Sequence, residues 1–379
     1  MCIGKKLKHF TNKKDLMNIL FVIGGGNLNA QIAQVALFLG LKNKGCTIYL
    51  IGGINEEVAE YITSQDNTIF FQDLYPKKKI DADYQDKFEN LLNKFNIDLV
   101  HFVSGKASRS GLIVLKKYPK IKSVVYFGSA SLHWYDPSSY LTYLHPRINA
   151  IIGNSDFVYN HVKKQLFGAN KQKAIRIFKG YSSDWFEDII PFDFTTLGIP
   201  KDAIIVCSVG NHRKVKGTKY FLESSYFLNS TKEIHYILIG NNTDTPKLKK
   251  IIDNSPISNK IHILGHRNDV AALMAGADMY AQTSLSEGFG RAISEAMSVG
   301  KPIVMTNAGG CTELIDENSG IIVPLKDSIG IAKAISSLAN NDKLRIQMGE
   351  NAKDRINNVY SIDRTVSETL ALYKKLLKQ

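Results

Sequence analysis

The sequence predicts an α/β protein with two doubly wound domains of parallel sheet, and three features indicate this. The chain has 379 residues, more than one ordinary hydrophobic core holds. A buried strand, a glycine-containing turn and a helix follow one another near residues 18–41 and again near residues 203–228. Between these repeats, residues 180–202 carry Gly and Pro with little periodicity, as is typical of a linker.

In the first half, short apolar runs alternate with residues at helical spacing. Strands are expected at 18–23, 47–51, 99–103, 123–127 and 149–154, and helices at 29–41, 84–95 and 157–167. The first strand runs into the triplet Gly24-Gly25-Gly26, and the sequence there reads GGGNLN. This is not the dinucleotide fingerprint G-x-G-x-x-G, so a Rossmann dehydrogenase is disfavoured.

The second half repeats the alternation. Strands are expected at 203–209, 235–239, 260–264, 279–282, 303–306 and 320–324. Helices are expected at 220–228, 291–299, 329–338, 343–359 and 363–378. Every apolar run is shorter than the ~20 residues of a transmembrane helix.

The segment 281–315 is the most informative stretch of the sequence. Glu287 stands just ahead of the helix expected at 291–299, and Glu295 lies eight residues further on, inside it. Gly288 and Gly290 allow a tight turn before this helix, because glycine tolerates positive φ. A helix N-terminus and a glycine loop both offer free backbone N–H groups to phosphate. Two carboxylates beside an anion site suit a ligand that also carries hydroxyls, as a sugar and a ribose do.

Two cations occupy the first turn of the second domain. Arg213 and Lys216 follow the strand expected at 203–209 and precede the next helix. Phosphate commonly binds at such turns in doubly wound domains. Two cations there can neutralise a diphosphate leaving group, although solvated basic residues in a short loop would look the same.

The string EGFGRAISE resembles the E-x7-E motif of the family 4 (group 1) retaining glycosyltransferases, which have the GT-B fold. NAGGCTELI is similar to that family's G-G-x-x-E-L-I loop, and RKVKG to its R-x-x-K-G. The resemblance implies a catalytic set comprising Glu287, Arg213, Lys216 and His133. The donor-binding residues that it implies are Glu295, Gly288, Phe289, Gly290, Gly309, Gly310, Glu313, Gly25, Gly26 and Arg267.

The sequence departs from the family pattern at two places. In many relatives a histidine directly follows the strand that corresponds to 123–127, whereas His133 comes six residues after Phe127. A packed or solvated loop histidine is an equal interpretation. The family's arginine usually follows the glycine at once, and here Asn211 occupies that position.

The resemblance also implies the domain plan and the reaction. An acceptor-side domain is expected at 1–190, a nucleotide-sugar domain at 191–360, and a helix crossing back at 361–379, with the domains facing across a cleft. A sugar would pass from a nucleotide-sugar to a saccharide or lipid-linked acceptor with retention of configuration. Such an enzyme would serve cell-surface polysaccharide or glycolipid synthesis. The alternatives are a nucleotide-sugar epimerase, a phosphorylase, or a catalytically silent nucleotide-binding protein.

No cofactor or metal is expected. Asp81-Ala82-Asp83 could hold a divalent cation, but it precedes a helical run, where acidic residues are ordinary. Cys2, Cys46, Cys207 and Cys311 are far apart and form no C-x-x-C, which favours a reducing cytoplasm.

The charge of the chain is uneven. The net charge is +13, of which residues 1–190 carry +9 and residues 191–379 carry +4. Lysines cluster at 5–14, 77–79 and 116–122. No nucleic-acid partner is expected. Either the chain is simply rich in lysine, or its first domain meets an anionic acceptor or the inner face of the cell membrane.

Overall fold

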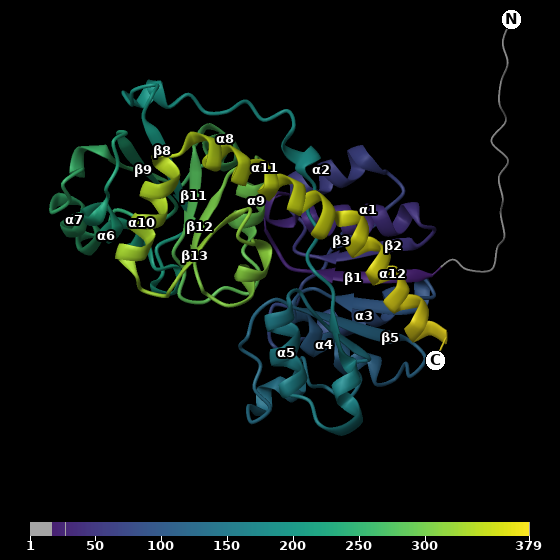
Figure 1. Cartoon of the computed structure of the whole chain (residues 1–379). Helices are drawn as coiled ribbons and strands as arrows, with labels where there is room; N and C mark the ends of the chain where they lie inside the picture. Colours follow the sequence, from purple (N-terminus) through teal and green to yellow (C-terminus); the bar gives the residue numbers. More distant parts are fainter. Residues whose placement is uncertain (1–16, 27, 379) are drawn as a thin grey trace, which may run out of the picture. The chain divides into compact units, whose positions relative to one another are not determined.

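The computed structural model describes residues 17–26 and 28–378, so the predicted lysine cluster at 5–14 and Cys2 lie outside the described residues. Contacts divide the chain into two units (Figure 1). The first unit comprises Met1–Tyr126, His133–Ile151 and Val366–Gln379, and the second comprises Phe127–Leu132 and Ile152–Thr365.

The first sheet of the described chain is parallel and has the strand order β3-β2-β1-β4-β5-β6-β7. Its centre is β1 (Asn18–Ile23), which pairs with β2 (Thr47–Gly52) and with β4 (Leu99–Phe102). The remaining strands are β3 (Phe70–Asp73), β5 (Lys122–Phe127), β6 (Ala150–Gly153) and β7 (Ala174–Arg176). The order reverses at β1, as in doubly wound folds, where ligands bind beyond the carboxyl ends of the strands.

The helices that alternate with these strands are α1 (Leu28–Asn43), α2 (Glu56–Gln65), α3 (Ala82–Lys94), α4 (Gly105–Leu115) and α5 (Asp156–Lys164). Asp81 caps α3, since its carboxylate accepts from the backbone N–H of Tyr84 at 3.3 Å. Asp81 thus lies at a helix N-terminus, as predicted. The last helix, α12 (Ile362–Lys378), reaches the first unit, where Tyr373 bonds the buried His101.

The second sheet is also parallel and has the order β10-β9-β8-β11-β12-β13. Its strands are β8 (Ile204–Val209), β9 (Ile234–Ile239), β10 (Ile261–Gly265), β11 (Met279–Gln282), β12 (Ile303–Thr306) and β13 (Gly320–Val323). Its helices are α6 (Thr218–Ser224), α7 (Pro246–Asp253), α8 (Val270–Gly276), α9 (Arg291–Ser298), α10 (Ser328–Ala339) and α11 (Asp342–Val359). Two sheets of Rossmann-like order were predicted, and both are present.

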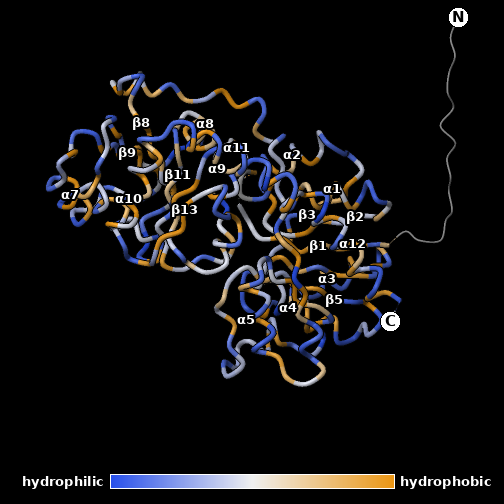
Figure 2. Tube along the Cα trace, viewed as in Figure 1, coloured by the Kyte–Doolittle hydropathy of each residue, from blue (hydrophilic) through white to orange (hydrophobic). Residues whose placement is uncertain are grey.

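Two apolar clusters lie on opposite faces of this second sheet. Tyr280 of β11 packs in one with Phe289 and Ile293, whereas Met279 and Ala281 of the same strand pack in the other. Side chains alternate along a strand, so a strand covered by helices on both faces buries every residue. In Figure 2 the apolar colouring gathers along the strands, and the outer helices alternate between polar and apolar.

The sequence did not reveal α2, β3, α4, β7, α7 and α8. The segment of α4, GKASRSGLIVL, is rich in Gly and Ser, which are weak helix formers. Tertiary packing decides its conformation, because a side chain at Gly111 would lie 2.6 Å from the ring of Phe102. The predicted helix at 157–167 begins at Asp156 and ends at Lys164, followed by a short 3-10 helix, Gly168–Lys173.

Candidate active site

Two glycine loops of the second unit run side by side. The N–H of Glu287 donates to the carbonyl of Ala308 at 2.7 Å, and the N–H of Gly310 donates to the carbonyl of Glu287 at 3.0 Å. A Cβ at Gly310 would lie 2.0 Å from the carbonyl oxygen of Gly288. Only glycine permits this approach, so the two motifs predicted from the sequence form one structural unit.

The loop that begins at Glu287 leads directly into α9. Gly290 has φ +95° and stands at the N-cap, which explains the glycine there. No side chain caps the helix, and its first turn holds no acidic residue. The first N–H groups of α9 and the positive end of its dipole are therefore available to an anion.

Lys216 and Glu287 form an ion pair across this site. Nζ of Lys216 lies 2.7 Å from Oε2 of Glu287, and each side chain is only 20% exposed. Backbone contacts hold the two segments together, since the N–H of Leu285 donates to the carbonyl of Val215 at 2.7 Å. Gly217 permits this contact, because a Cβ there would lie 1.9 Å from the carbonyl oxygen of Thr283.

Arg213 and Asn211 differ in what they bind. Arg213 is exposed and forms no ion pair within the described chain, so its guanidinium is available to a ligand. Asn211, which occupies the usual arginine position, accepts a hydrogen bond from the N–H of Asn241 at 2.9 Å through its side-chain oxygen. It therefore links two loops at the carboxyl ends of β8 and β9.

Glu295 is 16% exposed, and Nε of Arg291 lies 3.4 Å from its Oε1. Burial raises the pKa of Glu295, while Arg291 and Lys179 act in the opposite direction. Lys179 was not predicted for the site. Burial and the neighbouring Arg291 lower the pKa of Lys179 to about 8, and Glu295 opposes this shift. Its position just before the predicted linker gave no signal, because only the fold brings it near Glu295.

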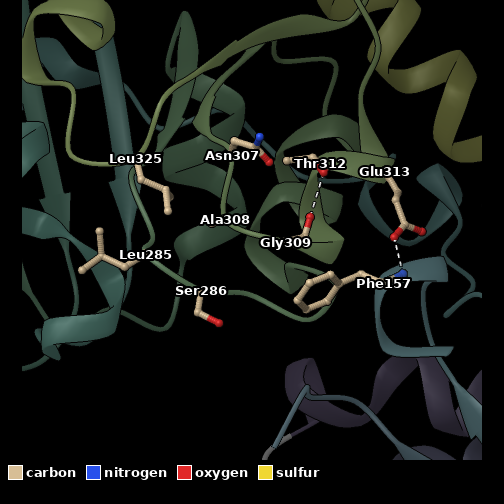
Figure 3. Close-up of a pocket in the computed structure, with 9 residues that line it drawn as sticks. All are labelled: Phe157, Leu285, Ser286, Asn307, Ala308, Gly309, Thr312, Glu313 and Leu325. Carbon is tan, nitrogen blue, oxygen red and sulfur yellow. Dashed lines mark hydrogen bonds between the residues drawn. The ribbon is translucent and has the colours of Figure 1, made fainter. Parts of the chain in front are cut away.

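A pocket of about 430 Å³ adjoins the paired loops (Figure 3). Its lining includes Leu285 and Ser286 on one side and Asn307, Ala308 and Gly309 on the other. Such a volume falls within the range of small-molecule sites. Residues of both glycine loops thus line a space that can accept a ligand.

Three residues predicted to bind the donor have other partners in this structure. The carboxylate of Glu313 accepts from the N–H of Asp156 at 2.6 Å. It also accepts from the N–H of Phe157 at 2.7 Å (Figure 3). Arg267 makes a bidentate ion pair with Asp269, at 2.8 and 2.6 Å. Phe289 is 4% exposed and packs in the core, so it anchors the loop.

The remaining predicted residues belong to the first unit. His133 is half-buried and stacks on Tyr135, with ring centroids 5.0 Å apart. Gly25 and Gly26 are exposed in the loop that follows β1. Gly25 lies close to Gly53, where an added Cβ would come within 2.9 Å of its Cα.

Two curated proteins are similar to part of this chain. One is the N-acetyl-alpha-D-glucosaminyl L-malate synthase of Bacillus anthracis, 26% identical over 182 residues, covering 48% of either chain. The other is the N,N'-diacetylbacillosaminyl-diphospho-undecaprenol alpha-1,3-N-acetylgalactosaminyltransferase of Campylobacter jejuni. It is 29% identical over 165 residues, covering 43% of this chain and 42% of that protein. The chain thus spans about half the length of the relatives that it matches.

Solved structures match nearly the whole fold. A glycosyltransferase from Rickettsia africae is 21% identical with a TM-score of 0.79, covering 96% of this chain and 100% of that one. The Anabaena protein Alr3699/HepE, in complex with UDP and glucose, is 19% identical with a TM-score of 0.76, covering 94% and 100%. These likenesses confirm the predicted GT-B fold class. Residues 190–355 match the family model of the glycosyl transferases group 1, so this segment is similar to that family.

Proposed function

We propose that this protein transfers a sugar from a nucleotide-sugar to an acceptor hydroxyl with retention of configuration. The observation that carries this proposal is the Lys216–Glu287 pair, set at the uncapped N-terminus of α9 with Glu295 inside the same helix. Cation, helix dipole and carboxylates together suit a ligand with a diphosphate, a sugar and a ribose. The Anabaena neighbour, solved with UDP and glucose, favours a UDP-sugar as the donor.

Catalysis would consist mainly of charge stabilisation. Lys216, Arg213 and the first N–H groups of α9 would hold the charge that develops on the leaving diphosphate. Glu287 would bind donor-sugar hydroxyls, and Glu295 those of the ribose. The leaving phosphate would itself help to deprotonate the acceptor hydroxyl, so that no side chain forms a covalent intermediate. No metal is required by this scheme.

A thermal-shift screen of UDP-, GDP- and ADP-sugars tests the donor, followed by transfer assays with the radiolabelled sugar that binds. Stabilisation by one nucleotide-sugar and transfer of label to a saccharide acceptor are expected. Product formed without any acceptor would indicate an epimerase. Binding with neither hydrolysis nor transfer would indicate a silent nucleotide-binding protein.

The acceptor is proposed to be lipid-linked and to be met at an anionic membrane surface. The Campylobacter relative is named for a diphospho-undecaprenol acceptor, and the excess positive charge lies in residues 1–190. None of the helices in the described chain is both long and apolar enough to span a bilayer. Each basic residue near an anionic surface would contribute about 1 kcal/mol, so several together would bind reversibly.

The first unit offers two exposed segments suited to this contact. Trp134 and Tyr135 are 49% and 66% exposed in the loop after β5, and Ile80 is 57% exposed beside the lysines of 77–79. Ser110 of α4 ties this lysine segment to the helix, because its Oγ accepts from the N–H of Asp81 at 3.1 Å. Amphipathic aromatic rings and basic side chains are both typical of residues at a membrane interface.

Vesicle flotation tests this contact. Binding to vesicles of phosphatidylglycerol and phosphatidylcholine at low salt is expected, with little binding to phosphatidylcholine alone. Trp134→Ser with Tyr135→Ser should weaken it, whereas Ile346→Ser, an equally exposed residue of α11, should not. Equal binding to both vesicle types, or none at low salt, would exclude the membrane role and leave the transfer reaction to be judged by its own assay.

A further inference from the structure

One face of β11 carries polar side chains deep in the second unit. Tyr280, Gln282 and Ser284 are 1%, 4% and 0% exposed and occupy alternate positions, so they lie on one face of the strand and its extension. The neighbouring positions Met279 and Ala281 are apolar. Burying polar groups costs free energy unless each forms a hydrogen bond. The hydrogen-bond partners of these three side chains therefore determine what their burial costs.

The three side chains form a hydrogen-bonded chain. The hydroxyl of Tyr280 lies 2.5 Å from Oε1 of Gln282, and Nε2 of Gln282 lies 2.7 Å from Oγ of Ser284. A contact of 2.5 Å is at the short end of the range for O–H···O and below the range for N–H···O, so the amide oxygen faces the tyrosine. Burial raises the pKa of Tyr280 well above its usual value, so the phenol stays a donor.

The direction of these hydrogen bonds determines which atom of Ser284 faces Glu287. Since Gln282 donates to Ser284, the hydroxyl hydrogen of Ser284 is left to point at Oε2 of Glu287, 3.3 Å away. That same oxygen accepts from Lys216 at 2.7 Å. Oε1 of Glu287 accepts no hydrogen bond from the described part of the chain, so it remains open to a ligand.

We propose that Tyr280, Gln282 and Ser284 are positioning residues that hold the carboxylate of Glu287 in one orientation, with Oε2 anchored and Oε1 presented to the donor sugar. This role rests on the proposed transfer reaction, in which Glu287 contacts the sugar. Lys216 alone cannot fix the carboxylate, because a flexible ammonium gives little directional restraint. The hydrogen bond from Ser284, which Gln282 and Tyr280 hold in place, is the second contact and defines the plane of the carboxylate.

Kinetics with the donor found in the nucleotide-sugar screen test this role. Ser284→Ala should lower kcat by about tenfold or more, the range for losing one hydrogen bond to a charged group, and leave UDP affinity unchanged. Tyr280→Phe should have a smaller effect of the same kind, since Gln282 can then reverse its amide. Once Glu287 is replaced by Gln, Ser284→Ala should cause no further loss, because its effect passes through that carboxylate.

Matched controls separate positioning from packing. Ser298→Ala removes an equally buried hydroxyl from α9, and Tyr236→Phe removes a buried phenol bonded to Ser224 at 2.9 Å. Both should keep normal kcat. Equal losses in the controls, or a full additional loss from Ser284→Ala in the Glu287→Gln background, would overturn the positioning role.

A structural readout keeps this inference separate from the transfer reaction. Crystal structures of the unliganded protein should show one Glu287 rotamer in the wild type and several in Ser284→Ala, with Lys216 in place in both. If the wild type turns over no nucleotide-sugar, the proposed reaction fails while these structures still decide the positioning role. A single unchanged Glu287 rotamer in Ser284→Ala would refute it.

Discussion

The carboxylate of Glu313 accepts a hydrogen bond from the backbone N–H of Phe157, 2.7 Å away, across 156 positions of the sequence. Its other oxygen accepts from Asp156, so both oxygens satisfy N–H groups in the first turn of α5. A carboxylate at that place also opposes the positive end of the helix dipole. In this arrangement Glu313 stabilises a helix, whereas the family resemblance implied contact with the donor.

Glu313→Ala should therefore destabilise the start of α5. Losing two charge-assisted bonds at a helix N-terminus costs about 1–2 kcal/mol. Hydrogen exchange of the amides in 156–159 should accelerate. Glu317→Ala, which alters an exposed glutamate nearby, serves as the control. Unchanged exchange together with a large loss of donor affinity would support the contact with the donor that the family resemblance implies.

Arg213→Ala and Lys216→Ala should both lower turnover sharply, but only one should lower stability. Each variant loses a contact to the diphosphate, which raises the activation free energy of transfer by about 2–4 kcal/mol. Arg213 is exposed and unpaired within the described chain, so its loss should change the free energy of unfolding by less than about 0.5 kcal/mol. Lys216→Ala also leaves the partly buried Glu287 without its cation, and should cost about 1–3 kcal/mol of stability.

Lys214→Ala is the matched control for this pair, because Lys214 is an exposed cation in the same turn. It should keep near-normal turnover in the transfer assay. Near-normal turnover in both Arg213→Ala and Lys216→Ala would remove the diphosphate assignment.

Titration calorimetry should distinguish the roles of Glu287 and Glu295. Glu295→Ala should weaken binding of bare UDP, because a buried carboxylate suits the ribose hydroxyls. Glu287→Ala should instead lower turnover and discrimination between donor sugars. If Glu287→Ala weakens UDP binding more than Glu295→Ala does, the two roles are reversed.

Transfer should continue in EDTA. Lys216, Arg213 and the N-terminus of α9 already supply positive charge at the expected diphosphate position. The assay is turnover before and after chelation, followed by addition of Mg²⁺ or Mn²⁺. Activity that disappears and then returns with the metal would contradict a metal-independent mechanism.

The segment around α9 could be predicted because several local signals agree there. Gly290 adopts positive φ and ends the loop, and Pro302 follows the helix just before β12. The pairing of Lys216 with Glu287 also follows from topology, since both follow strands whose carboxyl ends lie at one edge of the sheet. Local sequence signals and the order of the strands were together sufficient to predict the part of the site formed by Lys216, Glu287 and the start of α9.

The contacts that the sequence did not reveal join distant segments. Lys179 lies near Glu295 and Phe157 bonds Glu313, and neither pair has a local signal. Gln282 ends the strand predicted at 279–282 and Ser284 lies beyond it, yet both are buried on an extended strand face. Their role depends on which neighbour each polar atom meets, and that is decided by tertiary packing.

Lys179 predicts a pH dependence of stability. Its pKa is lowered to about 8 in the folded protein, first by burial and then by Arg291, against the ordinary 10.5. Between these two values the unfolded chain binds more protons at this residue than the folded one. The free energy of unfolding contributed by Lys179 therefore rises with pH through that window and is lowest below it.

Urea unfolding of wild type and Lys179→Met from pH 7 to 10 measures this contribution. The difference in unfolding free energy should favour the variant most at pH 7 and shrink as the pH rises, because the variant lacks the buried charge. Lys201→Met, at an exposed lysine of the same unit, should show a flat difference. A flat difference for Lys179→Met as well would mean that Glu295 compensates the buried ammonium fully, so that Lys179 stays charged in the folded protein.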